Sequence, residues 1–165
     1  MEYTDCTFKT KHGNFTFRVA AIIINCGKIL MVANSKCPYY YSVGGRARFG
    51  EKSESAVLRE AFEETGLRFE IDRLGFVYEN FFAEEIFNED NRNHEIAFHY
   101  YMKPMESYEL NCTSIGANDA KERLEWLDID RLKDYSLYPE FYKSELLKPL
   151  PYTKHIVEDN EHLGA

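Results

Sequence analysis

The chain has 165 residues, of which 44% are hydrophobic and 15% aromatic, and this is typical of one folded domain with a sizeable core. Its formal net charge of −8 argues against a protein that grips the nucleic-acid backbone, since that function needs a basic surface. No apolar run is long enough for a transmembrane helix, and the N-terminus lacks the basic and apolar regions of a secretory signal. We therefore expect a cytoplasmic protein that does not bind membranes or nucleic acids.

The first part of the chain is rich in strand signals. Alternating and then continuously apolar residues, interrupted by turn residues at 12–14, Gly27 and Pro38, predict a series of strands. The predicted strands are residues 3–10, 15–25, 28–33 and 39–43. The last of them leads directly into Gly44 and Gly45.

A helix is predicted from Ser53 to about Thr65. The Ser53 hydroxyl can accept an N–H of the first turn, which makes this residue a good N-cap. Gly66 is a natural residue for the end of the helix, because glycine adopts the left-handed conformation without strain.

Three carboxylates crowd together on this predicted helix. Glu60, Glu63 and Glu64 are spaced three and four residues apart or adjacent, so they fall on one face, where like charges repel. Solvent together with a pairing from Arg59 is one way to offset the repulsion. A hard divalent cation is the other, and Mg²⁺ is held by carboxylates, waters and substrate phosphates.

The remainder of the chain mixes strands with short helices. Strands are predicted at residues 69–82, 94–102, 108–112, 122–127 and 152–157, and helices at 128–133, where Asp128 is the cap, and at 139–147. Residues 83–93 and 113–120 are predicted to be loops, and the tail from about residue 158 is expected to be mobile. No linker or repeat divides the sequence, so a single domain over residues 1–165 is expected.

The stretch from Gly45 to Leu67 resembles the Nudix box. That family pattern is Gly, five residues, Glu, seven residues, Arg-Glu, an aliphatic residue, one residue, Glu-Glu, one residue, Gly and an aliphatic residue. Its positions are filled here by Gly45, Glu51, Arg59, Glu60, Ala61, Glu63, Glu64, Gly66 and Leu67. Two departures lie outside the fixed positions, Val43 where many members have Pro and Arg48 where many have Glu, and we expect both to affect substrate preference.

The resemblance implies an α+β fold of the Nudix type, an α/β/α sandwich in which the catalytic helix packs on a mixed β-sheet. It also implies that Glu60, Glu63 and Glu64 bind Mg²⁺, with Mn²⁺ as an alternative, and that Glu63 is either a ligand or the general base. Arg59 would orient Glu51 or Glu63, and the latter two with Arg59 form the expected catalytic group. Gly44, Gly45 and Arg46 would form the loop that receives the substrate phosphates. Glu95 is a candidate for the base or for an extra metal ligand, and the alternative is that it is an ordinary exposed residue of a strand.

The expected function is that of a MutT-like pyrophosphatase. It would cleave the diphosphate linkage of a nucleoside diphosphate joined to another group, such as a nucleoside triphosphate, ADP-ribose, a dinucleoside polyphosphate or a nucleotide sugar. The alternative is a non-catalytic Nudix domain that senses a nucleotide or regulates a partner. By resemblance, a homodimer is also expected. Tyr39, Tyr40, Phe49, Phe81 and Phe82 are candidates for stacking on a base, although most aromatic residues at strand spacing belong to a core.

Overall fold

A computed structural model describes residues 3–83, 92–108, 115–116 and 120–160. Its strands are β1 (Thr7–Thr10), β2 (Gly13–Ile22), β3 (Ile24–Asn25), β4 (Lys28–Asn34), β5 (Tyr40–Arg46), β6 (Ile71–Ala83), β7 (Arg92–Met102), β8 (Ile115–Gly116), β9 (Ala120–Asp128), β10 (Leu137–Tyr138) and β11 (Lys154–Asp159). Its helices are α1 (Ser53–Thr65), the 3-10 helix η2 (Ile129–Asp134) and α2 (Tyr142–Glu145). Every helix in these ranges is too short or too polar to cross a bilayer.

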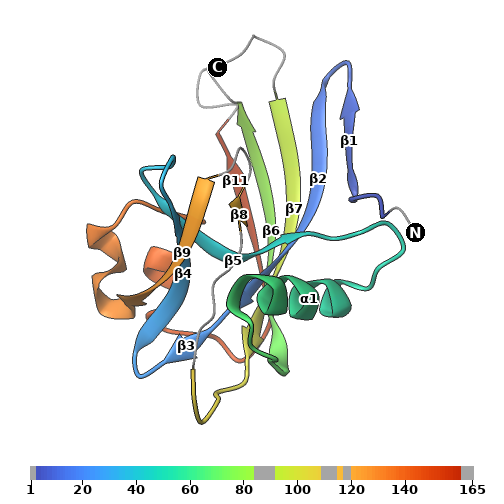
Figure 1. Ribbon diagram of the computed structural model, residues 1–165. Coiled ribbons are helices and arrows are strands. Elements are labelled where there is room, and N and C mark those ends of the chain that lie inside the picture. The colour runs from blue at the N-terminus through green and yellow to red at the C-terminus, as the bar shows by residue number, and fades with distance from the viewer. Residues whose placement is uncertain (1–2, 84–91, 109–114, 117–119, 161–165) are drawn as a thin grey trace.

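The strands form one mixed sheet in the order β11-β6-β7-β2-β5-β4-β9-β8 (Figure 1). Strand β2 runs parallel to β7 and antiparallel to β5, and β5 in turn pairs with β4. Strand β5 therefore lies between β2 and β4 and connects the two parts of the sheet that contain them. The predicted α+β fold with a mixed sheet is confirmed.

Helix α1 packs on one face of the sheet, against β5 and β2. Val57 and Ala61 of α1 are completely buried against Val19 and Ala21, which are alternate residues of β2. The intervening residues of β2 face the other side, where Ile22 packs with residues of η2 and α2. Helix α1 and the two short helices therefore cover opposite faces, as the sandwich architecture predicts (Figure 1).

The helix bounds were predicted correctly, but the N-cap was not. Lys52 is the N-cap residue of α1 and makes no side-chain capping bond. The Ser53 hydroxyl instead lies 2.7 Å from the hydroxyl of Tyr100 in β7, so a tertiary contact replaces the capping bond. Asp128 likewise makes no capping bond to η2 and pairs with Lys28 at 2.7 Å. Gly66 does end α1 in the left-handed conformation, with φ of 74°.

Other boundaries differ from the prediction, and for the strands the reason is that pairing across the sheet overrides local sequence signals. Regular pairing of the first strand begins only at Thr7, and the helix predicted at 139–147 is reduced to Tyr142–Glu145. Glu158 and Asp159 belong to β11 and pair with β6, so the chain is ordered beyond the predicted start of the tail. The loop predicted at 83–93 contains the end of β6 and the start of β7, and that predicted at 113–120 contains β8. Residues 84–91, 109–114, 117–119 and 161–165 lie outside the described residues.

A buried histidine lies between α2 and the sheet. His99 of β7 is 2% exposed, and its Nδ1 lies 2.7 Å from the hydroxyl of Tyr142 in α2. Burial lowers the pKa of His99 to about 3, because the surrounding apolar residues cannot solvate an imidazolium. The ring is therefore neutral in the folded protein at neutral pH.

This histidine predicts a loss of stability in mild acid. The unfolded histidine titrates near ~6.5, so between pH 6.5 and 3 the unfolded chain binds a proton that the folded chain does not. The free energy of unfolding should fall by about 2 kcal/mol between pH 7 and pH 5 on account of this residue. Denaturant unfolding of wild type and His99→Gln at both pH values measures the effect, and the variant should show a smaller decrease. Equal pH dependence of the two proteins would contradict it.

Candidate active site

Two glycines of β5 allow the carboxylates of α1 to approach the sheet. The N–H of Gly44 donates a hydrogen bond of 2.9 Å to Oε2 of Glu64. At Gly45, an added Cβ would lie 2.4 Å from Oε2 of Glu60. A side chain at Gly45 would therefore occupy the space that the Glu60 carboxylate fills.

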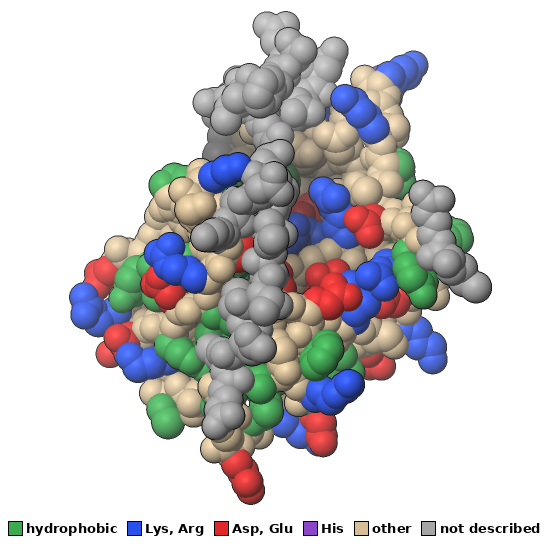
Figure 2. Space-filling view, in the orientation of Figure 1, with side chains coloured by type: hydrophobic (Ala, Val, Ile, Leu, Met, Phe, Trp, Pro, Cys, Tyr) green, Lys and Arg blue, Asp and Glu red, His purple; other side chains and the backbone are tan. Residues whose placement is uncertain are grey.

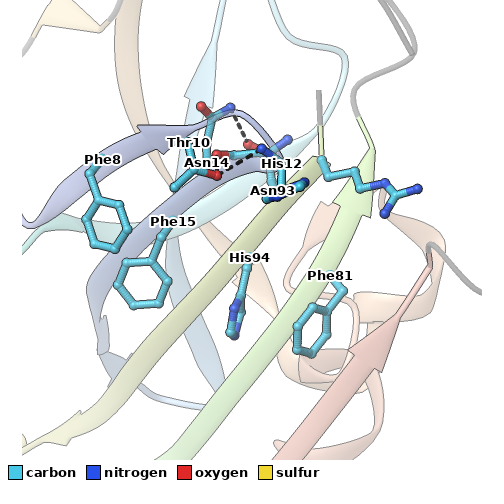
Figure 3. Close-up of a pocket in the computed structure, with 10 residues that line it drawn as sticks. Phe8, Thr10, His12, Asn14, Phe15, Phe81, Asn93 and His94 are labelled. Carbon is cyan, nitrogen blue, oxygen red and sulfur yellow. Dashed lines mark hydrogen bonds between the residues drawn. The ribbon is translucent and has the colours of Figure 1, made fainter. Parts of the chain in front are cut away.

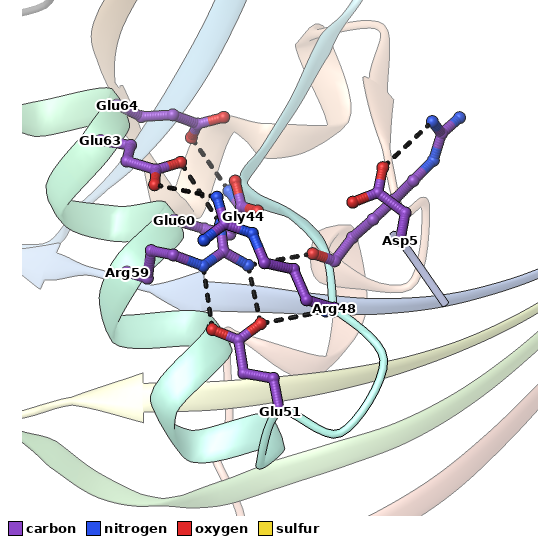
Figure 4. A network of polar contacts seen from close by, with 9 residues as sticks. Asp5, Gly44, Arg48, Glu51, Arg59, Glu60, Glu63 and Glu64 are labelled. Carbon is purple, nitrogen blue, oxygen red and sulfur yellow. Dashed lines mark hydrogen bonds and ion pairs between the residues drawn. The ribbon is translucent and has the colours of Figure 1, made fainter. Parts of the chain in front are cut away.

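Arg59 holds the carboxylates beside it. Its Nε and Nη2 donate to the two oxygens of Glu51, each at 2.9 Å, in the bidentate arrangement that suits a guanidinium and a carboxylate (Figure 4). Its Nη1 contacts Glu60 and, at 3.3 Å, Glu63, while Nη2 also donates to the carbonyl of Arg46 at 3.2 Å. One guanidinium thus ties the box loop to α1, and its hydrogen bonds to Glu51 lower the pKa of that carboxyl.

Burial has the opposite effect on Glu60 and Glu64. It raises the pKa of Glu64 to about 8, and the negative charges of Glu122 and Glu60 raise it further, against the Gly44 hydrogen bond. Burial also raises the pKa of Glu60, although the hydrogen bond from Arg59 lowers it. In both partly buried carboxyls, burial therefore outweighs the effect of the nearby positive charges on the pKa. A divalent cation would favour their ionised forms, so the oxygen donors of this site suit Mg²⁺ or Mn²⁺.

The three predicted metal ligands share one side of α1 but point to different partners. Glu60 and Glu63 are directed to Arg59, and Glu64 to Gly44 (Figure 4). Among the described residues, no three acidic, histidine or cysteine side chains are grouped so that they could hold a metal ion as they stand. Glu63 is also the most exposed of the three, with 49% of its side chain accessible. Binding of an ion would require these carboxylates to turn toward one another.

Two charged residues near the box were not identified from the sequence. Arg18 of β2 forms an ion pair of 3.7 Å with Glu95 of β7, and its charge lowers the pKa values of both Glu60 and Glu64. Glu122 of β9 accepts a hydrogen bond of 2.7 Å from the Tyr41 hydroxyl and raises the pKa of Glu64. A single arginine in the otherwise uncharged run of β2 was the available signal for Arg18.

Glu95, the candidate base or extra ligand, lies on the strand where it was predicted. Burial raises its pKa, and the charges of Arg18 and Arg46 lower it. Arg18 is therefore within electrostatic reach of Glu95 and of the α1 carboxylates alike. Figure 2 shows acidic and basic side chains around a hollow beside α1 on this face of the molecule. The role of Glu95 stays a prediction.

Comparison with known proteins places this geometry in a family. The family model of the NUDIX domain matches residues 14–145. The chain belongs to the Nudix family. This membership agrees with the box at Gly45–Leu67 and supports the predicted enzyme class, a Nudix-type pyrophosphohydrolase. Among curated proteins, none matches the chain.

Solved structures of Nudix proteins share the fold. A MutT NUDIX hydrolase from Burkholderia pseudomallei is 24% identical, with a TM-score of 0.55 over 70% of this chain and 84% of that one. A mutator MutT protein from Bacillus halodurans is 16% identical, with a TM-score of 0.61 over 88% and 91%. An ADP-ribose pyrophosphatase from Streptococcus suis is 16% identical, with a TM-score of 0.54 over 87% and 98%. At these identities the similarity establishes the Nudix fold and leaves the substrate open.

An aromatic pocket lies apart from the Nudix box. It has a volume of about 380 Å³ and is lined by residues of β1, β2, β6 and β7, including Phe8, Phe15, Phe81 and His94 (Figure 3). Phe81 stacks on His94 with ring centroids 4.4 Å apart, so this candidate for base stacking already packs against a protein ring. Tyr40, another candidate, donates a hydrogen bond of 2.7 Å to Glu125. Phe49 is 83% exposed.

The two glycines predict different effects of the same substitution. In Gly44→Ala the new Cβ would lie 2.2 Å from the backbone oxygen of Val19, at a φ of 144°, so we expect a loss of stability. Its size should be about 2–4 kcal/mol. In Gly45→Ala the three atoms nearest to the Cβ belong to the movable end of Glu60, so the unfolding free energy should change by less than about 1 kcal/mol. The displaced Glu60 should nevertheless weaken Mn²⁺ binding. Thermal unfolding and Mn²⁺ titration separate the two effects, and equal loss of stability in both variants would contradict this account.

Arg59→Lys should destabilise the protein although the charge is kept. A lysine ammonium cannot form both hydrogen bonds to Glu51, and it leaves carboxylate oxygens of the site poorly paired. We expect the free energy of unfolding to fall by about 1–3 kcal/mol. Arg131→Lys is the matched control, since Arg131 forms an ion pair with Asp134 and is 63% exposed. That change should cost less than about 0.5 kcal/mol in the same denaturant titration, and a similar cost for both variants would refute the role of Arg59.

Proposed function

We propose that this Nudix protein is a Mg²⁺-dependent hydrolase of nucleoside diphosphates linked to another group. The observation that carries the proposal is the placement of Glu60 and Glu64, which are partly buried beside the glycines of β5. Glu64 accepts the N–H of Gly44, and Glu60 pairs with Arg59. Such carboxylates with raised pKa values are poised for a divalent cation. The net charge of −8 supports a small nucleotide substrate over a nucleic acid.

Each residue of the box then has a physical role. Glu60 and Glu64 would hold the metal ion, and Glu63, which is more exposed, would act as a further ligand or take the proton of the attacking water. When bound, the ion supplies an activated water and neutralises phosphate oxygens. Arg59 positions Glu51 and the box loop, and Gly44, Gly45 and Arg46 would line the path of the phosphates. Glu95, paired with Arg18, stays the second candidate for the base.

The identity of the leaving group is not encoded in these contacts. The names of proteins with the same fold include MutT hydrolases and an ADP-ribose pyrophosphatase. We therefore include nucleoside triphosphates, ADP-ribose, dinucleoside polyphosphates and nucleotide sugars among the candidate substrates. Cytoplasmic location and a homodimeric state are further predictions from the sequence that a fractionation and a sizing experiment would test.

The alternative function is a non-catalytic Nudix domain that senses a nucleotide. Domains of that kind are expected to lose box carboxylates, whereas every fixed acidic position is retained in this chain. A sensor would bind a nucleotide without turnover and would need no metal-bound water. Measurement of hydrolysis therefore separates the two functions directly.

Glu64→Gln tests the proposed function. Wild type should hydrolyse at least one class of the candidate substrates with Mg²⁺ and none with a chelator, as measured by chromatographic separation of substrate and products. Glu64→Gln should lower kcat/KM by more than about 10²-fold, because it removes a metal ligand and not merely a supporting group. Its melting temperature should be unchanged or higher, since an amide is less costly to bury than a carboxylate.

Glu54→Gln is the matched control for this substitution. Glu54 lies in the first turn of the same helix and is exposed, away from the contacts described above. Its activity should stay within about twofold of wild type, as expected for a surface position. Full activity of Glu64→Gln would overturn the assignment of the metal site, and turnover that survives chelation would overturn the metal dependence.

A further inference from the structure

The segment that precedes β1 pairs with the loop of the Nudix box. The N–H of Cys6 donates to the carbonyl of Ala47 at 2.7 Å, and the N–H of Phe49 donates to the carbonyl of Thr4 at 2.8 Å. Asp5 forms an antiparallel bridge with Arg48 between these two bonds. Residues 3–6, which we call the N-terminal segment, therefore act as an additional strand beside residues 46–49. The spacer of the box, which is residues 46–50 between Gly45 and Glu51, is therefore held by this pairing as well as by Arg59.

The side chains of this pairing reach the carboxylates of α1. The guanidinium of Arg48 lies over the ring of Tyr3, with its Cζ 4.6 Å from the ring centroid. On its other side, Nη2 of Arg48 is 3.6 Å from Oε1 of Glu63 (Figure 4). Asp5 contacts the neighbouring Arg46 at 3.7 Å and lies away from the α1 carboxylates. Of the two arginines of the spacer, Arg48 is thus the one that is directed at the site.

Arg48 and Arg59 differ in how many hydrogen bonds their guanidinium groups make to carboxylates. Arg59 makes two bonds of 2.9 Å to Glu51 and further contacts to Glu60 and Glu63. The only contact that the Arg48 guanidinium makes with a carboxylate of the described residues is 3.6 Å long, which exceeds a hydrogen bond. An aromatic ring contacts the flat face of a guanidinium and leaves its N–H edges available. Tyr3 therefore orients Arg48 without consuming its donors.

We propose that Arg48 binds a phosphate of the substrate and that Tyr3 is its positioning residue. This inference rests on the proposed function, and it adds a phosphate contact and the N-terminal segment to the site. A guanidinium edge matches the oxygens of a phosphate group and provides two parallel hydrogen bonds. Neutralisation of Glu63 by a divalent cation would weaken its attraction for Arg48, so the arginine would then be released to a phosphate.

Binding of imidodiphosphate, a diphosphate analogue with a bridging nitrogen, tests the contact without turnover. In calorimetric titrations with saturating Mg²⁺, Arg48→Gln should raise Kd at least about tenfold relative to wild type, as expected for loss of a hydrogen bond between charged groups. Tyr3→Ala should raise Kd about threefold or more, because an exposed cation–π contact holds the arginine in place. Tyr3→Phe retains the ring face and should restore wild-type binding. Tyr152→Ala, in which a ring that is 61% exposed is removed from a distant surface, is the control for loss of an aromatic residue.

Kinetics with whichever substrate is hydrolysed give the second measurement. The same two variants, Arg48→Gln and Tyr3→Ala, should raise KM in proportion to Kd while kcat stays within about threefold, since they alter binding and not the chemical step. Their melting temperatures should match that of wild type, and their Mn²⁺ affinities should be no lower than that of wild type. A purely structural role of Tyr3 would lower the melting temperature and would not be rescued by phenylalanine in the KM measurement.

The outcomes distinguish this inference from the proposed function. If wild type hydrolyses a substrate but Arg48→Gln and Tyr3→Ala bind imidodiphosphate normally, the phosphate contact is wrong and the hydrolase stands. If wild type binds imidodiphosphate through Arg48 but hydrolyses nothing, the contact stands and the hydrolase is wrong. A parallel loss of Mn²⁺ affinity in Arg48→Gln would overturn the contact, because Arg48 would then support the metal ligands. Absence of both binding and turnover in folded wild type would refute both.

Discussion

The guanidinium of Arg59 contacts three carboxylates, and the geometry of the site depends on this shared contact. Glu51 comes from the box loop, whereas Glu60 and Glu63 come from α1, so a single side chain sets the distance between loop and helix. Without it the acidic residues would repel one another, and Glu51 of the loop would lose its ion pair with the helix. A fold that keeps several carboxylates close together needs such an internal cation. Arginine suits the role because its planar group can serve several acceptors at once.

The sheet supplies what Arg59 cannot, which is a fixed surface for the helix to approach. Strand β5 receives Glu64 on the N–H of Gly44 and leaves room for Glu60 at Gly45. Val19 of β2, which is the partner of Gly45 in the sheet, is completely buried under α1. The polar contacts of Glu60 and Glu64 therefore depend on the same packing of α1 against the sheet that forms the apolar core. The contacts of the candidate site and the packing of the core use adjacent residues of the same two strands.

Local features of the site could be predicted from the sequence because the box is a continuous stretch. The bounds of α1, its end at Gly66 and the pairing of Arg59 with Glu51 all follow from residues within 23 positions of one another. Arg18 and Glu122 lie on strands that reach the site only through the sheet order, so no spacing in the sequence indicates them. Ser53 shows the same limit, since its hydroxyl bonds to Tyr100 of a distant strand and not to its own helix. Propensity predicts what a segment does alone, and tertiary partners decide the remainder.

The parallel pairing of β2 with β7 has a consequence for how the protein folds. It joins Asn14 to Asn93 and continues through Ile22 and Tyr101, so the chain must close a loop of about 79 residues before this part of the sheet exists. The glycines of β5 and the carboxylates of α1 are only about 20 residues apart and close a much shorter loop. Closure of long loops costs more chain entropy and slows folding. The box can therefore assemble early in the folding reaction, whereas the sheet that buries its helix is completed late.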